Sequence, residues 1–486
     1  MIPTIKTLLE RMDEAGIRAC HWKSNWALAV TMEGATDIDL LIHRQDAQRF
    51  RDLLAELRFE PSIEAGVQAI PSTEHHVALD PETGTLVHVH AYYRVITGES
   101  LAKNYRLPVE EMLLANTRRE GIVTVPTRGA ELIVFVLRMM VKHTTAIELM
   151  LLARQTRQLR SEIEWLVTDE AVQEAEKLLP VWLPQLDARL FRAAVEALRR
   201  PAPAWRRVAV GYRVRHRLRT YARRPVLRAR AVGASKFAGV VSHRLTGSSK
   251  KLTPGGGGGV IAFVGSEATG KSTVIERMHG WLGENYTVRR IHAGKPPATA
   301  LTYVPHVLLP WLRRAFPEQR STRVERQTRT PELAPGRTYP LMFGIRSVML
   351  AYERRALLTH AFALSANGTI VLCDRYPSSR SGAPDGPQLG HLAAPDPLRR
   401  WLTALETRLY DDVPAPDLVV HLTAPLDVTL ARNAARDKTE PEDYVRFRHA
   451  LSSGLEFDGV PVHRVATDRS LEEVVRDVKD AIWETL

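Results

Sequence analysis

A short apolar stretch followed by a glycine-containing loop constrains this chain more than any other feature. Residues 260–264 are apolar and partly β-branched, Gly265 follows them, and Gly270-Lys271-Ser272 precedes a segment that can open a helix. This is the spacing G-x-x-x-x-G-K-[S/T] between a strand and a helix. Glycines let successive backbone N–H groups turn inward around phosphate oxygens, and the helix N-terminus adds partial positive charge. The sequence therefore predicts a nucleoside triphosphate site.

Two residues of this loop have distinct expected roles. Lys271 is expected to reach the β- and γ-phosphates, and the hydroxyl of Ser272 is expected to ligate Mg²⁺. The predicted nucleotide-binding residues are Gly265, Ser266, Glu267, Ala268, Thr269, Gly270, Lys271, Ser272 and Thr273.

Length and composition bound the remaining alternatives. A chain of 486 residues is too long for a single core, so we expect two or three domains. No apolar run approaches the roughly 18–20 residues that span a bilayer, and no signal-peptide pattern precedes the first amphipathic segment. The two cysteines, Cys20 and Cys373, both lie in apolar surroundings. We expect buried free thiols and a cytoplasmic location.

From residue 260 onward, predicted strands alternate with predicted helices. This alternation indicates an α/β domain at 260–486 with a parallel sheet and helices on both faces. Asp374 and Arg375 follow the buried strand 369–373, at the edge of such a sheet where ligands bind. The predicted strands are 260–264, 286–292, 369–373 and 417–422, and the predicted helices include 339–367, 426–436 and 472–485.

This C-terminal region resembles the thymidylate kinase branch of P-loop nucleotide kinases. The resemblance rests on the loop acid Glu267, on Arg354-Arg355 in the long helix, on Asp374-Arg375-Tyr376, and on a lid-like stretch at 432–440. It implies that Asp374 helps to position Mg²⁺ and that Arg375 grips the acceptor phosphate. It also implies that the lid arginines, Arg432 and Arg436, close over the transferring group, with ATP as the donor. Lys271, Asp374, Arg375, Arg432 and Arg436 are thus the expected catalytic residues.

The segments that contact the nucleobase in that family differ here. The chain has His292–Thr299 where the family has Arg-Glu-Pro-Gly-Gly-Thr, and an insertion at about 300–338 follows. The stretch 381–387 replaces the family's Tyr-Gln-Gly segment. The resemblance therefore implies the phosphate chemistry without naming the acceptor.

Near the N-terminus, two acids lie two residues apart. In a strand, Asp37 and Asp39 project on the same face, where a divalent cation is the usual way to offset their charge. Metal binding and solvated strand-end acids are both open interpretations. His21, His88 and His90 are candidate ligands of the same kind, although isolated histidines are more often ordinary hydrogen-bonded residues.

The N-terminal region resembles the nucleotidyltransferase superfamily. Lys23-Ser24-Asn25 takes the place of that family's Gly-Ser loop, and Asp37-Ile38-Asp39 takes the place of its metal-binding pair. The third acid of the family is replaced by histidine on the predicted strand 85–90. The resemblance implies an α+β nucleotidyltransferase-like domain at 1–127, which a helical extension at 128–198 follows.

A basic segment at 199–259 separates these regions. From Ala197 to Ser266 the chain has 16 Lys and Arg and no Asp or Glu, so the net charge of +12 belongs largely to this segment. Arginines alternate with apolar residues at 205–230. We favour a linker whose arginines are solvated or paired with the flanking domains. Contact with an anionic membrane or with nucleic acid are the other two interpretations.

These observations predict an ATP- and Mg²⁺-dependent phosphotransferase. Its partners would be a nucleotide and a phosphorylated small-molecule acceptor, such as a nucleoside monophosphate. One alternative is nucleotidyl transfer through Asp37 and Asp39. The other is a non-catalytic switch in which ATP binding reorganises the domains.

Overall fold

The computed structural model separates the chain into two compact units, Met1–Gly255 and Gly256–Leu486. The second unit begins four residues before the predicted boundary at 260, and the finer boundaries predicted at 127 and 198 stay predictions. The structure describes residues 1–64, 70–99, 102–142, 156–199, 204–246, 251–299, 301–303, 336, 338–383, 385–435 and 439–486. Each unit is described by itself below.

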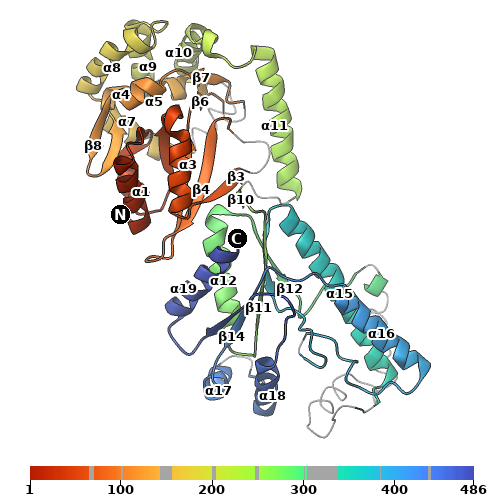
Figure 1. The fold of residues 1–486 in the computed structure, drawn as a ribbon. Coiled ribbons are helices and arrows are strands. Elements are labelled where there is room, and N and C mark those ends of the chain that lie inside the picture. The colour runs from red at the N-terminus through yellow and green to blue at the C-terminus, as the bar shows by residue number, and fades with distance from the viewer. Residues whose placement is uncertain are drawn as a thin grey trace. The chain divides into compact units, whose positions relative to one another are not determined.

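The first unit is built on a six-stranded mixed sheet with strand order β1-β2-β5-β4-β3-β10 (Figure 1). The pair β2–β5 is parallel, and the other pairs are antiparallel. Its last strand lies in the predicted linker, so part of that segment completes the first sheet. The strands are β1 (Ala19–His21), β2 (Ile38–Ile42), β3 (Glu60–Glu64), β4 (Thr73–Leu79), β5 (Leu86–Tyr92) and β10 (Leu252–Pro254).

Alternation along β5 assigns the two faces of this sheet. Val87, Val89 and Ala91 pack in one core with the helices that precede β1 and β3, α1 (Pro3–Glu14) and α3 (Ala47–Glu56). His88 and His90 lie between them and Tyr92 follows Ala91, so the opposite face carries polar side chains within a buried strand. Shorter elements surround the sheet: η1 (Asn25–Ala27), α2 (Leu28–Met32), η2 (Arg44–Asp46), β6 (Val95–Thr97), β7 (Tyr105–Leu107), α4 (Glu110–Ala115), β8 (Thr117–Glu120) and β9 (Val123–Pro126).

A helical core adjoins this sheet in the first unit. Its central helix α5 is buried along most of its length, as its apolar sequence predicts. Val210, Val214 and Leu218 join the same core, so the first part of the basic segment packs as structure rather than as a free linker. The helices are α5 (Arg128–Lys142), α7 (Thr156–Leu166), α8 (Asp169–Trp182), α9 (Ala188–Arg199), α10 (Ala204–Arg217), η4 (Arg219–Tyr221) and α11 (Val226–Thr246). Among the described helices, none has both the length and the apolar character needed to cross a membrane.

The second unit is the expected α/β fold. Five strands form an entirely parallel sheet in the order β12-β13-β11-β14-β15. The strands are β11 (Val260–Gly265), β12 (Val288–His292), β13 (Ile370–Asp374), β14 (Leu418–Thr423) and β15 (Val462–Ala466). The helices are α12 (Lys271–Asn285), α15 (Leu341–Ala366), α16 (Pro397–Asp411), α17 (Leu426–Ala434), α18 (Glu442–Ser453) and α19 (Leu471–Thr485).

Helices cover both faces of the parallel sheet. Helix α15 packs through Leu358 and Ala361 against alternate residues of β11, and Figure 1 shows α12 and α19 on the other side. The central strand β11 lies between β13 and β14, so the chain order reverses beside it. Ligands of such sheets bind outside the carboxyl ends of the strands at this point. The loop predicted to bind a triphosphate follows β11 directly.

The start of β11 is fixed by a close backbone approach at Gly258. Its N–H donates to the carbonyl of Ser365 at 3.1 Å, and a Cβ there would lie 2.2 Å from the carbonyl oxygen of Thr369. We predict that Gly258→Ala lowers the unfolding free energy of the second unit by about 2 kcal/mol, because the carbonyl oxygens of Ser365 and Thr369 cannot move freely away from the added methyl group. Gly280→Ala, in α12 with no heavy atom within 4 Å of the added methyl, is the matched control and should stabilise or be neutral. Thermal melts of both variants test this, and equal melting temperatures would contradict it.

Candidate functional site

The loop between β11 and α12 has a backbone that requires its glycines. Gly265 and Gly270 have φ angles of +142° and +86°, and Ala268 between them has +60°. A Cβ at Gly265 would lie 2.3 Å from the carbonyl oxygen of Leu422 on β14. The hydroxyl of Thr269 donates to the carbonyl of Ser266 at 2.9 Å and holds the turn from within. The motif's glycines therefore occupy positions that a side chain would fill or strain.

Lys271 is the first residue of α12, and it is buried against this loop. Its ammonium donates to the carbonyl oxygens of Gly265 at 3.0 Å and Ser266 at 2.5 Å. Burial lowers the pKa of Lys271 to about 8, although the Glu267 carboxylate acts in the opposite direction. The next residues, Ser272 and Thr273, are exposed at the helix start. The loop thus combines a desolvated cation with an accessible hydroxyl.

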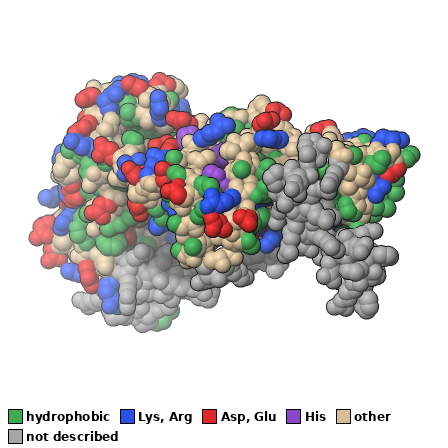
Figure 2. Space-filling model, turned by 90° about the horizontal axis from the view of Figure 1, so that it is seen from below, with side chains coloured by type: hydrophobic (Ala, Val, Ile, Leu, Met, Phe, Trp, Pro, Cys, Tyr) green, Lys and Arg blue, Asp and Glu red, His purple; other side chains and the backbone are tan. Residues whose placement is uncertain are grey.

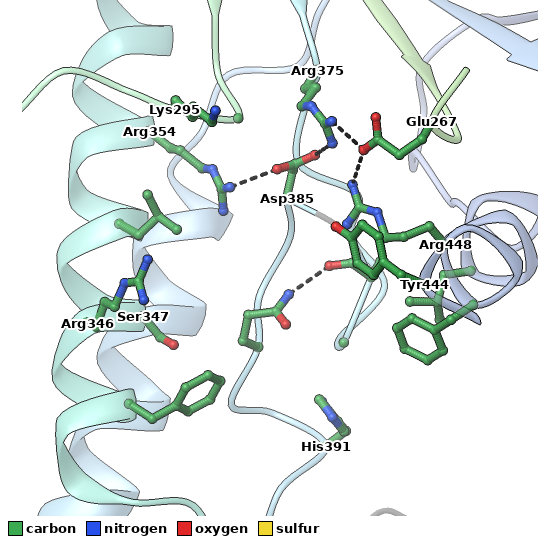
Figure 3. A pocket seen from close by; sticks show the side chains of 18 of the residues that line it. Glu267, Lys295, Arg346, Ser347, Arg354, Arg375, Asp385, His391, Tyr444 and Arg448 are labelled. Atoms are coloured by element: carbon green, nitrogen blue, oxygen red, sulfur yellow. Dashed lines mark hydrogen bonds and ion pairs between the residues drawn. The ribbon is translucent and has the colours of Figure 1, made fainter. Parts of the chain in front are cut away.

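A chain of alternating charges extends from the loop (Figure 3). Glu267 accepts from Arg375 at 2.7 Å and from Arg448 at 3.5 Å. Arg375 also donates to Asp385 at 3.1 Å, and the second oxygen of Asp385 accepts from Arg354 at 2.9 Å. We call these five side chains the ion chain. They come from the loop, the segment after β13, α15 and α18, so the network joins four separate parts of the unit.

The members of the ion chain stabilise one another's charges. Burial alone would raise the pKa of Asp385, but Arg354 and Arg375 hold it below its usual value. Burial likewise would lower the pKa of Arg375, and its two carboxylate partners raise it instead. Arg354 is 4 % exposed and donates further to Ala293 O at 3.0 Å and to the Tyr410 hydroxyl at 2.7 Å. Asp385 and Arg375 are therefore both charged at neutral pH.

The ion chain borders a cavity of about 520 Å³ at the carboxyl edge of the sheet. In Figure 3, Arg346, Ser347 and Arg354 come from α15 on one side, and Tyr444 and Arg448 come from α18 on the other. Figure 2 shows the molecule from below the view of Figure 1, and basic, acidic and histidine side chains are visible near the centre of that view. The charged lining residues are Lys295, Arg346, Arg354, Arg375, Arg448, Glu267 and Asp385, and the apolar ones include Phe343, Leu350, Leu392, Phe447 and Leu451.

Among the predicted catalytic residues, the structure places Arg375 at the cavity and Arg432 away from it. Asp374 ends β13 opposite Phe263 of β11, and its carboxylate accepts from Arg290 at 3.2 Å. Arg375 follows with a φ of +74°, and its side chain reaches the cavity. Arg432 instead donates to the carbonyl of Thr467 at 2.6 Å and is absent from the described residues that line the cavity. Arg436 lies outside the described residues.

Sequence reasoning missed two members of the ion chain. Asp385 belongs to the stretch 381–387, for which the sequence predicts no role beyond a difference from the family pattern. Arg448 lies on α18, beyond the stretch 432–440 where the lid arginines were expected. The available signal for Arg448 was modest: a second arginine-containing helix that begins after Pro441, with Arg446 and Arg448 two residues apart.

The residues present fit a phosphate group and Mg²⁺. The glycine positions of the loop and the buried ammonium of Lys271 suit phosphate oxygens. Mg²⁺ keeps several waters and needs few protein ligands, so the hydroxyl of Ser272 and the carboxylate of Asp374 would be its candidate donors. Within the described ranges, no group of three or more His, Cys, Asp or Glu side chains could hold a metal ion.

In the first unit, Asp37 and Asp39 contact positive or imidazole groups of their own chain. Asp39 lies 2.9 Å from the ammonium of Lys23 and 3.4 Å from Nδ1 of His90, its neighbour across β2 and β5. Asp37 lies 2.8 Å from Nδ1 of His88. Burial alone would raise the pKa of Asp39, but Lys23 and His90 hold it well below its usual value. Metal binding by Asp37 and Asp39 stays a prediction.

Histidines continue this cluster across the sheet. Nε2 of His88 lies 2.9 Å from Nδ1 of His75 on β4, and the rings of His75 and His90 stack with centroids 4.1 Å apart. Burial lowers the pKa of His90 to about 4, so His90 is neutral at physiological pH despite Asp39 beside it. His21 is separate from this row and pairs with Asn25 at 2.6 Å.

Comparison with known proteins gives two distant relatives. The chain is 23% identical over 231 residues to a protein named "Uncharacterized ATP-binding protein YghR" from Escherichia coli strain K12. It matches the protein of the same name from Escherichia coli O6:H1 equally well. Each match covers 86% of the relative and 46% of this chain. No protein-family model matches the chain.

The lowered pKa of Lys271 predicts a pH-dependent stability of the second unit. The pKa is 10.5 in a free lysine and about 8 here, so the unfolded chain binds more protons between these pH values. The unfolding free energy should therefore rise with pH across this window, by at most roughly 3 kcal/mol. We predict that Lys271→Met removes this rise. Thermal melts at several pH values test it, and parallel pH profiles for the two proteins would contradict it.

The contact between Lys23 and Asp39 predicts a coupled pair. Lys23→Met should cost about 2–3 kcal/mol, because it leaves a largely buried carboxylate without its cation. The double variant Lys23→Met with Asp39→Asn should lose less stability than the two single variants added together, by at least about 1 kcal/mol. The exposed pair Lys6–Glu10, with side chains 60% and 48% exposed, is the control and should show almost no coupling. Denaturant titrations of the single and double variants measure the coupling energy of each pair. Additive losses at Lys23 and Asp39 would contradict the prediction.

Proposed function

We propose that the second unit is an ATP- and Mg²⁺-dependent phosphotransferase that acts on a phosphorylated small molecule, such as a nucleoside monophosphate. The loop motif between β11 and α12 supports a triphosphate donor. The printed name of the two relatives, which describes them as ATP-binding, supports ATP as this donor. The placement of the cavity beside the loop supports transfer to a second substrate.

The charge of the cavity is the observation that carries the proposal. Five of its lining residues are cations and two are carboxylates, and one of these carboxylates, Glu267, belongs to the loop itself. Arg354, Arg375 and Arg448 share these two carboxylates, and Lys295 adds a further cation, so cations outnumber carboxylates in the lining. A phosphate monoester carries between one and two negative charges at neutral pH and is stabilised in such surroundings. A neutral acceptor would bring no negative charge to this lining.

Each charged residue then has a role that its position allows. Lys271 would balance the charge of the donor phosphates at the loop. Arg375, which contacts both the loop acid and Asp385, would orient the acceptor. An acceptor oxygen forms the new bond to the γ-phosphorus while the bond to ADP breaks, and positioning and charge neutralisation supply most of the catalysis. Arg448 on α18 would add charge from the opposite wall.

We predict that ADP release depends on an acceptor and is lost in Lys271→Ala. An acceptor screen with labelled ATP, including nucleoside monophosphates and phosphosugars, would identify the product. Arg375→Ala should lower kcat/KM at least 100-fold, because it removes a charged contact to the acceptor within a desolvated site. Full turnover in Arg375→Ala would disprove the assignment of the acceptor site. Release of pyrophosphate, lost in Asp39→Ala, would point instead to nucleotidyl transfer, and tight ATP binding without any product would point to a switch.

Two arginines of α18 provide a matched control for this assay. Arg448 lines the cavity, whereas Arg446 pairs with Glu442 at 2.6 Å and its side chain is 50% exposed. Arg448→Ala should raise the KM for the acceptor about 10-fold or more, as expected for a charged hydrogen bond. Arg446→Ala should leave it unchanged. Equal effects of the two substitutions would mean that α18 acts only through its fold.

A further inference from the structure

Helix α11 turns apolar side chains toward solvent. Val226, Leu227 and Phe237 are 62%, 80% and 48% exposed. At about 100° per residue, these three side chains fall within an arc of roughly a quarter to a third of the helix circumference. Arg230 and Ala234 lie within the same arc and are also exposed. An ordinary surface helix shows the reverse pattern, with its apolar stripe against the core.

The opposite side of α11 faces the protein. Ala229 is buried, and Lys236 is partly buried, with a pKa that burial lowers. Just before the helix, Arg223 donates to the carbonyl of Lys103, and the carbonyl of Arg224 accepts from Asn104. The helix is thus anchored along one side while its apolar residues lie on the other. Such an exposed apolar stripe marks a surface that contacts something else.

The charged residues of α11 itself are all positive. Arg228 and Arg230 are exposed on α11, and neither forms an ion pair with any described residue. The chain has no Asp or Glu between Ala197 and Ser266, so the segment supplies no acid to neutralise them. The partner of this face should therefore be both anionic and able to accept aliphatic side chains.

We propose that the exposed face of α11 binds an anionic lipid surface. Val226, Leu227 and Phe237 would enter the boundary between headgroups and acyl chains while Arg228 and Arg230 contact lipid phosphates. Nucleic acid offers phosphates to the arginines but nothing that favours burial of Val226 and Leu227. The helix lies along the surface in this arrangement, which agrees with the finding that no described helix can cross a membrane. The proposal is independent of the cavity in the second unit.

Co-sedimentation of the full chain with vesicles tests the proposal. We expect binding to phosphatidylcholine vesicles that contain about a third phosphatidylglycerol, and far weaker binding to pure phosphatidylcholine. Arg228→Ala with Arg230→Ala should weaken binding roughly 30-fold, since each arginine near an anionic surface contributes about a factor of five. Leu227→Ser with Phe237→Ser should weaken it about as much, whereas Leu227→Phe with Phe237→Leu should preserve it.

Matched substitutions elsewhere in the first unit provide the control. Val181 is 71% exposed on α8 and Arg189 is exposed on α9, so Val181→Ser with Arg189→Ala should bind vesicles like the wild type. Circular dichroism checks that all variants are folded. Three outcomes would overturn the proposal: equal binding to both vesicle types, retained binding in Leu227→Ser with Phe237→Ser, or self-association that those serines abolish. The last would show that a second copy of the chain covers this face.

Discussion

The second unit depends on the ion chain at the carboxyl edge of its sheet. Two carboxylates, Glu267 and Asp385, each lie between two guanidinium groups. In a region of low dielectric, each of these charges is stable only because its neighbours are opposite in sign. The members belong to the loop, α15, α18 and the segment after β13, so the same interaction that makes their burial tolerable also fixes the relative positions of four elements. The same ion pairs therefore balance the charges at the site and hold its four elements in place.

Backbone geometry supports this network. Arg375 has a left-handed φ of +74°, which side chains with a Cβ adopt rarely. A Cβ at Gly294 would lie 2.4 Å from Cδ of Arg375, so the absence of a side chain there leaves the path of this arginine open. Strained backbone persists where the surroundings over-determine it, and ion pairs at 2.7 Å to Glu267 and 3.1 Å to Asp385 do so here. The unusual conformation therefore serves to aim Arg375 into the cavity.

The sequence predicts the fold of the second unit better than its site. Strand–helix alternation after residue 260 correctly indicated a parallel sheet, because periodicity and turn residues are local signals. The long helix was predicted at 339–367 and lies at Leu341–Ala366. Arg448, in contrast, contacts Glu267 across 181 residues, and no local pattern encodes such a pairing. At Asp37 and Asp39, the spacing predicts either a divalent-cation site or solvated acids, and the metal site stays a prediction. The spacing did not reveal that Lys23 and His88 of the same chain lie against these acids.

The two kinds of lining residue together restrict what the cavity can accept. Its charged members favour a phosphate, yet a volume of about 520 Å³ far exceeds what a phosphate group fills. In Figure 3, Arg346, Ser347 and His391 lie below the ion chain, toward the lower part of the view. Phe343, Leu350, Leu392 and Phe447 give the lining apolar side chains that would bury a ring or carbon chain. Inorganic phosphate would leave these apolar side chains in contact with water, and a purely apolar molecule would bring no negative charge to the cations. An acceptor that joins a phosphate to an extended organic group satisfies both requirements.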